Sequence, residues 1–345
     1  MMRNEIRMLA AAAMLATVSL EPRTALAVSL GSVADLFNVY TIGDIGSVSD
    51  PYAGSEFQGI TGAGGSAYFD NFFVNSGDVF GPFGVLTGQG LTLTDGTISG
   101  GLSSGGAVSL TRVQVNGAAN SGPGFTAVDS TINGNLTTQT AANLTNSTVT
   151  GSKTVAAYSA PIDINALNNS LINSANSFAA LPQTGSLGET CGGGGARPCT
   201  LTFNGASGQN VFDVDASLIN QTGLVNFTGA SDATFILDIV NGTSILLSSI
   251  GFSLAPGIGL SDILWNVAQV ANVTLSLIEL PGTLLAPNAN VDFTSASIDG
   301  SLYAKNLTGN GEAHVVPEPG TWAMLVTGLL ALFLAQRRSR ATSVG

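Results

Sequence analysis

The side chains that most often perform catalysis are scarce in this chain of 345 residues, which contains one histidine, His314, and two cysteines. An activated nucleophile or a metal-bound water usually needs histidine, so His314 alone supports neither a hydrolytic triad nor a zinc site. A carboxylate pair could serve a glycosidase or bind calcium, and Asp213 and Asp215 alternate onto one strand face. A solvated strand face explains them more simply. We therefore expect no catalytic residue, no cofactor and no metal.

The two cysteines, Cys191 and Cys199, enclose the glycine run from Gly192 to Gly195. This run lacks the Lys-Ser/Thr pair that a phosphate-binding loop requires, so it predicts a plain loop. In an exported chain, two cysteines at this spacing favour a disulfide over two free thiols. Two ligands are also too few for a metal site.

The chain has few charged residues, and most of them are acidic. Only 9% of the residues are charged, with 10 basic against 22 acidic, and glycine contributes 44 residues. Six of the basic residues lie in the two terminal segments, so the body keeps only Arg112, Lys153, Arg197 and Lys305. An acidic body repels a phosphate backbone, which excludes nucleic acid as a partner.

Four glycines recur at a constant spacing of 17 residues and define an internal repeat. They are Gly100, Gly117, Gly134 and Gly151, which close the phrases TISG, QVNG, TING and TVTG. Small or apolar residues stand two, seven and nine positions before each glycine, as in a bent strand with one buried face. Such a period predicts a parallel β-solenoid, or β-helix, in which each coil stacks on the next. A β-sandwich, with its evenly spaced short strands, is the alternative.

The phrase returns as Val291 to Gly300, but the distance from Gly151 to Gly300 is not a multiple of 17. We therefore expect an insertion, at about residues 161–182, and coils of other lengths. Apolar residues at steps of three and four predict an amphipathic helix there, lying along the solenoid flank. The apolar stripe consists of Ile164, Leu167, Leu171, Ala175 and Phe178. The expected fold class is thus all-β with one inserted helix.

Directly after this helix, Leu181-Pro182-Gln183-Thr184-Gly185 spells the sortase pentapeptide of Gram-positive bacteria. That motif needs a membrane helix and a basic tail immediately behind it, whereas the rest of the domain follows here. Proline also ends helices. We therefore interpret the pentapeptide as a helix stop followed by a turn.

Hydroxyl-bearing residues occupy outward positions of the repeat and suggest a binding surface. Six positions before the repeat glycines come Thr94, Thr111, Val128 and Thr145, with Thr294 in the late copy; three before come Thr97, Gln114, Thr131, Thr148 and Ser297. A flat array of hydroxyls and methyls could lie against a polysaccharide or against ice. The high strand propensity of threonine is the alternative explanation. The candidate binding face comprises Thr94, Thr111, Thr145 and Thr294.

The beginning of the chain predicts export. Arg3 and Arg7 precede an apolar stretch from Met8 to Leu20, and Ala25-Leu26-Ala27 fits the small-x-small pattern of a signal peptidase site. We assign residues 1–27 to a signal peptide. The domain of residues 28–314 would then lie outside the inner membrane.

The end of the chain, residues 315–345, reads as a sorting tail. Pro317-Glu318-Pro319 precedes an uncharged run from Trp322 to Ala335, and then come Arg337, Arg338 and Arg340. A basic flank behind an apolar segment is typical of a stop-transfer helix, expected at about residues 320–336, although a full span needs about 20 apolar residues.

These three parts, in this order, resemble the PEP-CTERM sorting signal of Gram-negative bacteria. The resemblance implies that an exosortase in the membrane recognises Pro317, Glu318 and Pro319 after export. It also implies that the tail anchors the protein only transiently in the inner membrane before release to the cell surface or the extracellular matrix. Producers with this signal commonly make an extracellular polysaccharide, which is the expected partner in a biofilm.

The body resembles the choice-of-anchor A domain over most of residues 30–314. The most specific matches are Leu264-Trp265-Asn266, Gly282 to Ala289 and Gly300 to Lys305, together with Leu36 to Ile45 near the start. Members of that family look like surface adhesins or matrix proteins. A fainter similarity is to bacterial ice-binding solenoids. We therefore expect a non-enzymatic adhesin or structural protein, with a carbohydrate-binding or ice-binding solenoid as the alternative.

Overall fold

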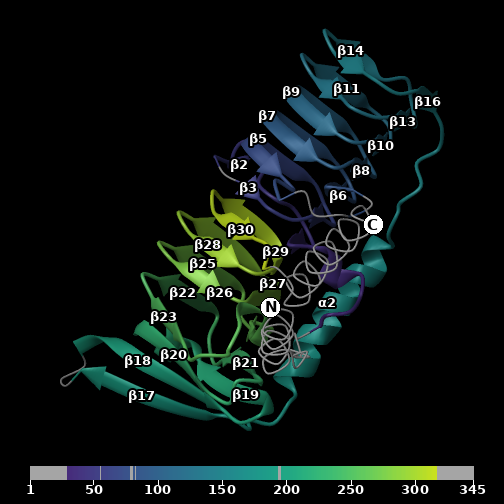
Figure 1. Ribbon diagram of the computed structural model, residues 1–345. Coiled ribbons are helices and arrows are strands. Elements are labelled where there is room, and N and C mark those ends of the chain that lie inside the picture. The colour runs from purple at the N-terminus through teal and green to yellow at the C-terminus, as the bar shows by residue number, and fades with distance from the viewer. Residues whose placement is uncertain (1–28, 55, 78–80, 82, 193–195, 317–345) are drawn as a thin grey trace, which may run out of the picture. The chain divides into compact units, whose positions relative to one another are not determined.

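The computed structural model describes residues 29–54, 56–77, 81, 83–192 and 196–316, so the expected signal peptide and sorting tail lie outside the described residues. Within these ranges the chain winds in stacked coils (Figure 1). Every strand pair among them is parallel except one hairpin, β17 (Ser186–Gly192) with β18 (Ala196–Gly205). The fold is therefore the expected β-solenoid, because a sandwich would be built from antiparallel pairs.

One side of every coil contributes to a continuous surface that we call the helix face. In spatial order its strands are β16 (Lys153–Val155), β13 (Leu136–Thr138), β10 (Ala119–Ser121), β8 (Leu102–Ser104), β6 (Val85–Thr87), β4 (Thr61–Ala63), β1 (Val39–Thr41), β29 (Leu302–Gly309), β27 (Thr283–Thr294), β24 (Ile263–Asn266), β21 (Ala233–Val240) and β19 (Gly208–Asp215). The order shows that the coils are not stacked in the sequence order of the chain.

Long strands bend between two further faces. The bend in β7 (Leu91–Ser99) falls at Asp95, with φ 52°, and the bend in β9 (Val108–Asn116) falls at Arg112, with φ 54°. Both residues adopt the left-handed region, which side chains other than glycine rarely occupy. The same conformation recurs at Asp129 and Asn146, at the 17-residue spacing.

The residues before the bend form the threonine face, and those after it form the third face. The threonine face runs through β14 (Asn143–Thr145), β11 (Phe125–Val128) and the first halves of β9, β7 and β5 (Ala67–Val74), and continues in the second halves of β29 and β27, then β25 (Asn272–Ser276) and β22 (Ser244–Ser248). The third face contains β15 (Thr148–Val149), β12 (Thr131–Ile132), β3 (Glu56–Phe57), β30 (Glu312–His314), β28 (Ser297–Asp299) and β26 (Glu279–Pro281), with β2 (Tyr52–Ala53) paired to β5.

Most of the remaining elements lie in the lower part of the stack. They are the sheet β17-β18-β20 (Thr222–Gly229)-β23 (Gly251–Leu254), the short helix α3 (Ala216–Ile219) and the 3₁₀ turn η2 (Leu260–Asp262). The 3₁₀ turn η1 (Ala34–Leu36) instead contacts β29 near the middle of the stack, where its Ala34 carbonyl accepts a hydrogen bond from Tyr303.

The expected helix is α2 (Ile164–Ala179), and it returns the chain to the opposite end of the stack, where a second half-solenoid begins. The chain builds upward from β1 to β16, returns along α2 to the opposite end, and builds upward again from β19 to β29. The last coil then docks against the first, with Val39 opposite Leu302 and Thr41 opposite Ala304. The helix is therefore a return segment between two half-solenoids, where we had expected an insertion into one stack.

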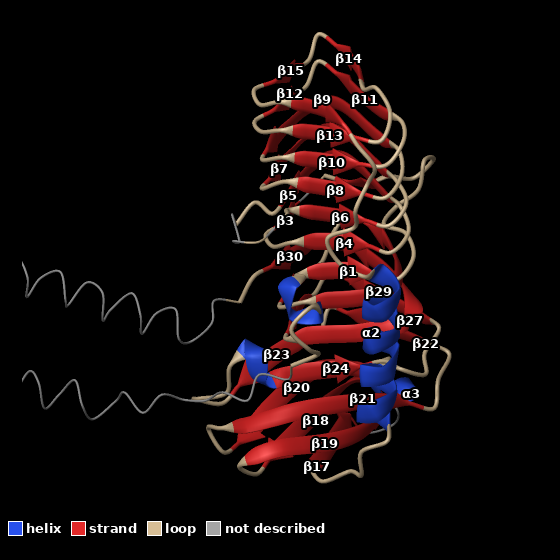
Figure 2. Ribbon diagram, turned by 90° about the vertical axis from the view of Figure 1, so that its right-hand side faces the viewer, coloured by secondary structure: helices blue, strands red, loops and turns tan. Residues whose placement is uncertain are grey.

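The predicted apolar stripe fastens α2 to the helix face. Leu167, Leu171 and Ala175 are buried against a second core cluster that includes Leu264 and Leu285. Figure 2 shows α2 lying across β29, β24 and β21. Asp163 caps the helix start, because its side chain accepts a hydrogen bond from the Ala166 amide at 3.0 Å.

Two polar contacts fix the helix at both of its ends. The Tyr40 hydroxyl donates to Asn168 Oδ1 at 2.7 Å, and Asn266 Nδ2 donates to the Ala175 carbonyl at 3.0 Å. Asn266 is fully buried and also donates to Asp238 Oδ1 at 2.8 Å. Burial raises the pKa of Asp238, although the hydrogen bond from Asn266 opposes this shift.

The repeat glycines allow the coils to approach closely. A Cβ atom on Gly117 would lie 2.5 Å from the Gly100 carbonyl carbon, and one on Gly134 would lie 2.6 Å from the Gly117 carbonyl carbon. Carbon atoms pack best at about 3.5–4.0 Å. The 17-residue glycine spacing thus reflects backbone contact between successive coils.

Candidate functional site

The predicted threonines form a ladder on the threonine face of the upper coils. Strand pairing places Thr94 opposite Thr111, Thr111 opposite Val128, and Val128 opposite Thr145. These side chains point outward, because the alternate residues Leu93, Leu110 and Ala127 are buried. Neighbouring rungs of such a ladder are about 4.8 Å apart.

A second ladder runs parallel to the first, two residues earlier in each strand. It consists of Thr92, Ser109, Thr126 and Asn143, which pair in consecutive register. Along one strand the two ladders are about 6.6 Å apart, since each residue advances about 3.3 Å. The sequence could have revealed this row, because residues two positions apart on a strand share a face.

Together the two ladders form a plane without charge. The strand segments Leu91–Thr94, Val108–Thr111, Phe125–Val128 and Asn143–Thr145 contain no acidic or basic residue. Charged groups appear only at the border of the plane. At the bend, the Arg112 guanidinium donates to both carboxylate oxygens of Asp95, which lowers the pKa of Asp95 and raises that of Arg112. In the next coil, Asp70 pairs with Thr94 and ends the neutral plane.

The structure separates Thr294 from the other candidate residues. Thr294 lies in the second half-solenoid, where it pairs with Ser276 in β25. The coils that contain β29, Ile45 and β5 lie between its strand and β7. The row three positions before the glycines, which includes Thr97 and Gln114, lies beyond the bend on the third face. The expected single array is therefore divided between two faces, and only Thr94, Thr111 and Thr145 share the neutral plane.

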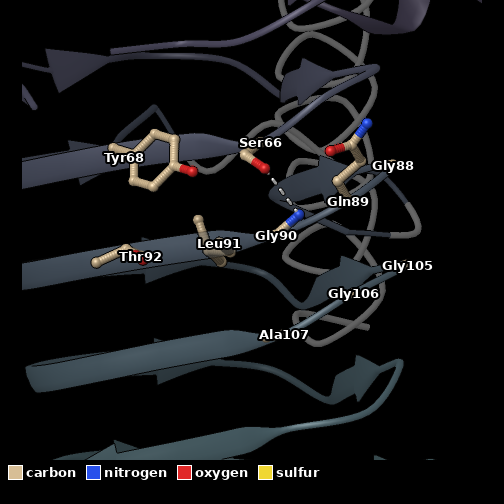
Figure 3. A pocket seen from close by; sticks show the side chains of 10 residues that line it. All are labelled: Ser66, Tyr68, Gly88, Gln89, Gly90, Leu91, Thr92, Gly105, Gly106 and Ala107. Atoms are coloured by element: carbon tan, nitrogen blue, oxygen red, sulfur yellow. Dashed lines mark hydrogen bonds between the residues drawn. The ribbon is translucent and has the colours of Figure 1, made fainter. Parts of the chain in front are cut away.

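A shallow groove adjoins the edge of this plane that faces β5 (Figure 3). Its volume is about 540 Å³, and Tyr68, Gln89 and Thr92 contribute side chains to its lining. Its floor is glycine-rich because the coils touch there: a Cβ on Gly88 would collide with the Gly64 carbonyl oxygen. The Gly90 amide donates to Ser66 Oγ at 3.2 Å, as the dashed line in Figure 3 marks. No charged residue lines the groove.

His314 belongs to an exposed acidic group on the third face. Its Nδ1 lies 2.8 Å from Asp299 Oδ1, and its Nε2 lies 3.4 Å from Glu312 Oε2. Burial tends to lower the pKa of His314, but the hydrogen bonds and negative charges of Asp299 and Glu312 outweigh it, so the pKa is raised. A hydrogen bond and charge repulsion from Asp299 raise the pKa of Glu279.

The two aspartates of β19 have different surroundings. Asp215 caps α3, where its carboxylate accepts from the Ser217 amide at 2.8 Å, and hydrogen bonds from Ser217 lower its pKa. Asp213 is exposed to solvent. Asp215 therefore serves as a helix cap and Asp213 faces solvent, which agrees with the simpler interpretation of a solvated strand face.

Cys191 and Cys199 are joined in a disulfide within the β17–β18 hairpin. Just before this hairpin, Thr184 and Gly185 of the pentapeptide both donate their amides to the Val211 carbonyl at 2.9 Å. These residues therefore form part of the fold at the edge of β19.

The expected sorting residues Pro317, Glu318, Pro319, Arg337, Arg338 and Arg340 lie outside the described residues. Among the residues that are described, no helix is both long and apolar enough to cross a membrane.

Family comparisons match both parts of the chain. The domain described as "Putative Ice-binding-like adhesive domain" matches residues 30–315, and the "PEP-CTERM protein-sorting motif" matches residues 315–338. The second motif is the recognition signal for exosortase processing, and together the two matches fit a secreted surface protein. The domain that matches carries a name other than choice-of-anchor A. A sequence comparison with curated proteins finds no match.

Solved structures of low similarity include three ice-binding proteins. The protein LeIBP from an Arctic yeast is 18% identical, with a TM-score of 0.42 over 86% of this chain and 98% of that one. The protein from the Antarctic ascomycete Antarctomyces psychrotrophicus is 20% identical, with a TM-score of 0.32 over 58% and 93%. The protein from an Antarctic Flavobacteriaceae bacterium is 15% identical, with a TM-score of 0.32 over 85% and 99%.

Proposed function

Because the chain belongs to the family of the ice-binding-like adhesive domain, we propose that it is an exported adhesin of the cell surface or extracellular matrix. The sorting-motif match at residues 315–338 supports this extracellular location. An exosortase recognises Pro317, Glu318 and Pro319, and the tail resides only transiently in the inner membrane. The role is non-enzymatic: adhesion requires a presented surface and no reactive group.

The charge-free plane of the threonine face carries the proposal, and its chemistry selects the ligand. Each hydroxyl can donate and accept a hydrogen bond, while the threonine methyl groups add apolar contact. The strongly acidic body repels a polyanion. The ligand is therefore a neutral polymer with repeated hydroxyl groups, and a neutral extracellular polysaccharide meets both conditions.

The groove beside the plane supports a sugar ligand. Tyr68 offers an aromatic ring that can pack against the apolar face of a sugar ring, and Gln89 offers an amide that donates and accepts hydrogen bonds. The groove shares Thr92 with the plane, so one chain of sugar units could occupy both.

Co-sedimentation with neutral polysaccharide from the producing cells tests this function. Thr94→Glu with Thr111→Glu places two charges in the plane, and we expect binding to fall at least tenfold, which corresponds to about 1.4 kcal/mol. Gln114→Glu with Thr148→Glu on the third face is the matched control and should bind like the wild type. Equal binding by both double variants, or no binding by the wild type, would contradict the proposal.

Ice is a second candidate ligand of the same plane. The specific observation is the constant register of the rungs in both ladders, which gives a regular two-dimensional array of hydroxyl and methyl groups. Thermal hysteresis of the same variants distinguishes the ligands. Ice is favoured as the ligand if the wild type shows thermal hysteresis and only the Thr94 and Thr111 double variant loses it. A wild type without thermal hysteresis rejects ice, and the polysaccharide assay then decides.

A further inference from the structure

The upper end of the solenoid is open. Strands β14, β15 and β16 form its last coil, and among the described strands each pairs on one side only, with β11, β12 and β13 respectively (Figure 1). Their outer backbone N–H and C=O groups are therefore unpaired edges. The core residues of this coil, Leu144 and Val149, are only partly buried, and Val155 is 64% exposed.

The lower end of the solenoid differs from the upper end. The amides of Thr184 and Gly185 bond to the edge of β19 at Val211, and the disulfide-closed β17–β18 hairpin belongs to a separate sheet, in which β17 pairs with β18 alone among the described strands. The two ends therefore present different strand edges.

Lys153 occupies a core position in the open coil. Strand pairing places it above Leu136, which lies above Ala119 and Leu102 in turn. Those three side chains are at most 2% exposed, whereas Lys153 is exposed because none of the coils that the structure describes lies above it. From Thr140 to Val155 Lys153 is the only charged residue, and no carboxylate is present.

We propose that this open coil is a docking surface for a β-strand edge that brings a carboxylate opposite Lys153, and that Lys153 excludes the same open coil of a second copy. Inward-pointing charges are a known means of blocking edge-to-edge association. Two copies meeting end to end would bring two ammonium groups into the centre of the stacked coils, and burying unpaired charges is strongly unfavourable. A partner carboxylate removes this penalty, and the partner strand then covers Leu144 and Val149.

Charge exchange in the full-length chain tests the proposal. Wild type and Lys153→Glu should each remain unassociated through this end, because like charges meet, whereas an equimolar mixture should form a 1:1 pair. Lys153→Leu should self-associate, with at least a tenfold lower dissociation constant than the wild type. Light scattering in mild detergent measures the masses, and the tail, which is the same in every variant, cannot cause a difference among them.

Lys305→Glu is the matched control, since Lys305 is an exposed lysine in the side of the stack. Its mixture with wild type should stay unassociated. Circular dichroism verifies that each variant keeps its strand content. The proposal is overturned by a mixture of wild type and Lys153→Glu that does not pair, or by Lys153→Leu that does not self-associate. It is independent of the polysaccharide proposal.

Discussion

Replacing Gly117 by alanine should push two coils of the solenoid apart. The added Cβ would lie 2.5 Å from the Gly100 carbonyl carbon and 2.6 Å from the Gly101 amide nitrogen. Since carbon contacts are most favourable near 3.5–4.0 Å, the coils must move by about 1 Å against a spacing of about 4.8 Å. Both neighbours are backbone atoms and cannot rotate away. We expect a loss of about 1–3 kcal/mol, the usual cost of overpacking.

Gly188→Ala is the matched control, because its Cβ would have no neighbour closer than 3.7 Å. Neither Gly117 nor Gly188 has a left-handed φ, so the two substitutions differ mainly in steric contact. Alanine at a compatible position changes stability by less than about 1 kcal/mol. Chemical denaturation followed by circular dichroism compares the two variants. Equal unfolding free energies would refute the close-contact explanation of the 17-residue glycines.

Two further substitutions test the return helix and the acidic group around His314. Leu171→Ala removes a side chain with 0% exposure and should cost about 2–5 kcal/mol in denaturation, whereas Asn173→Ala on the exposed helix side should cost little; equal losses would contradict the packing. The raised pKa of His314 contributes stability that is fully present below about pH 6.5 and is lost as pH rises through the folded pKa. Melting curves recorded at increasing pH should show a falling melting temperature in the wild type and not in His314→Gln. Parallel pH profiles of the two proteins would reject a stabilising role of protonated His314.

The repeat region could be predicted from the sequence because each local signal agreed with the fold. The glycine spacing, the apolar positions and the helical stripe all correspond to observed contacts, from the Gly117 backbone contact to the burial of Leu171. The bend in each coil was expected from the spacing of the apolar positions. Its left-handed conformation was not, although Asp129 and Asn146 are of the residue types that adopt this region most readily. We combined Thr94 and Thr97 in one flat array because we did not place them on opposite sides of that bend.

The order of the coils in the stack could not be predicted because its determinants are far apart in sequence. The hydroxyl of Tyr303 donates to the Ala34 carbonyl at 2.9 Å and to the Phe37 carbonyl at 3.1 Å, and these contacts fasten the last coil to the first. A 17-residue period describes coils that are consecutive in sequence. It carries no information about which coil of the second half-solenoid packs against the first coil of the chain. The specific phrase Leu264-Trp265-Asn266 has a local explanation: Leu264 and Asn266 contact α2, while Trp265 donates to the Pro281 carbonyl at 2.9 Å.

The order of the coils also decides where the domain connects to its sorting motif. The final described strand, β30, pairs with β28 below and β3 above, in the middle of the stack, and the Val315 amide then donates to Gln58. Six coil steps separate β30 from the open upper coil, a distance of about 29 Å. A solenoid stacked in sequence order would instead release its tail from one end. Connection at the middle places the start of the neutral plane three coil steps above β30, at β7, and the open coil at the far end of the same half-solenoid.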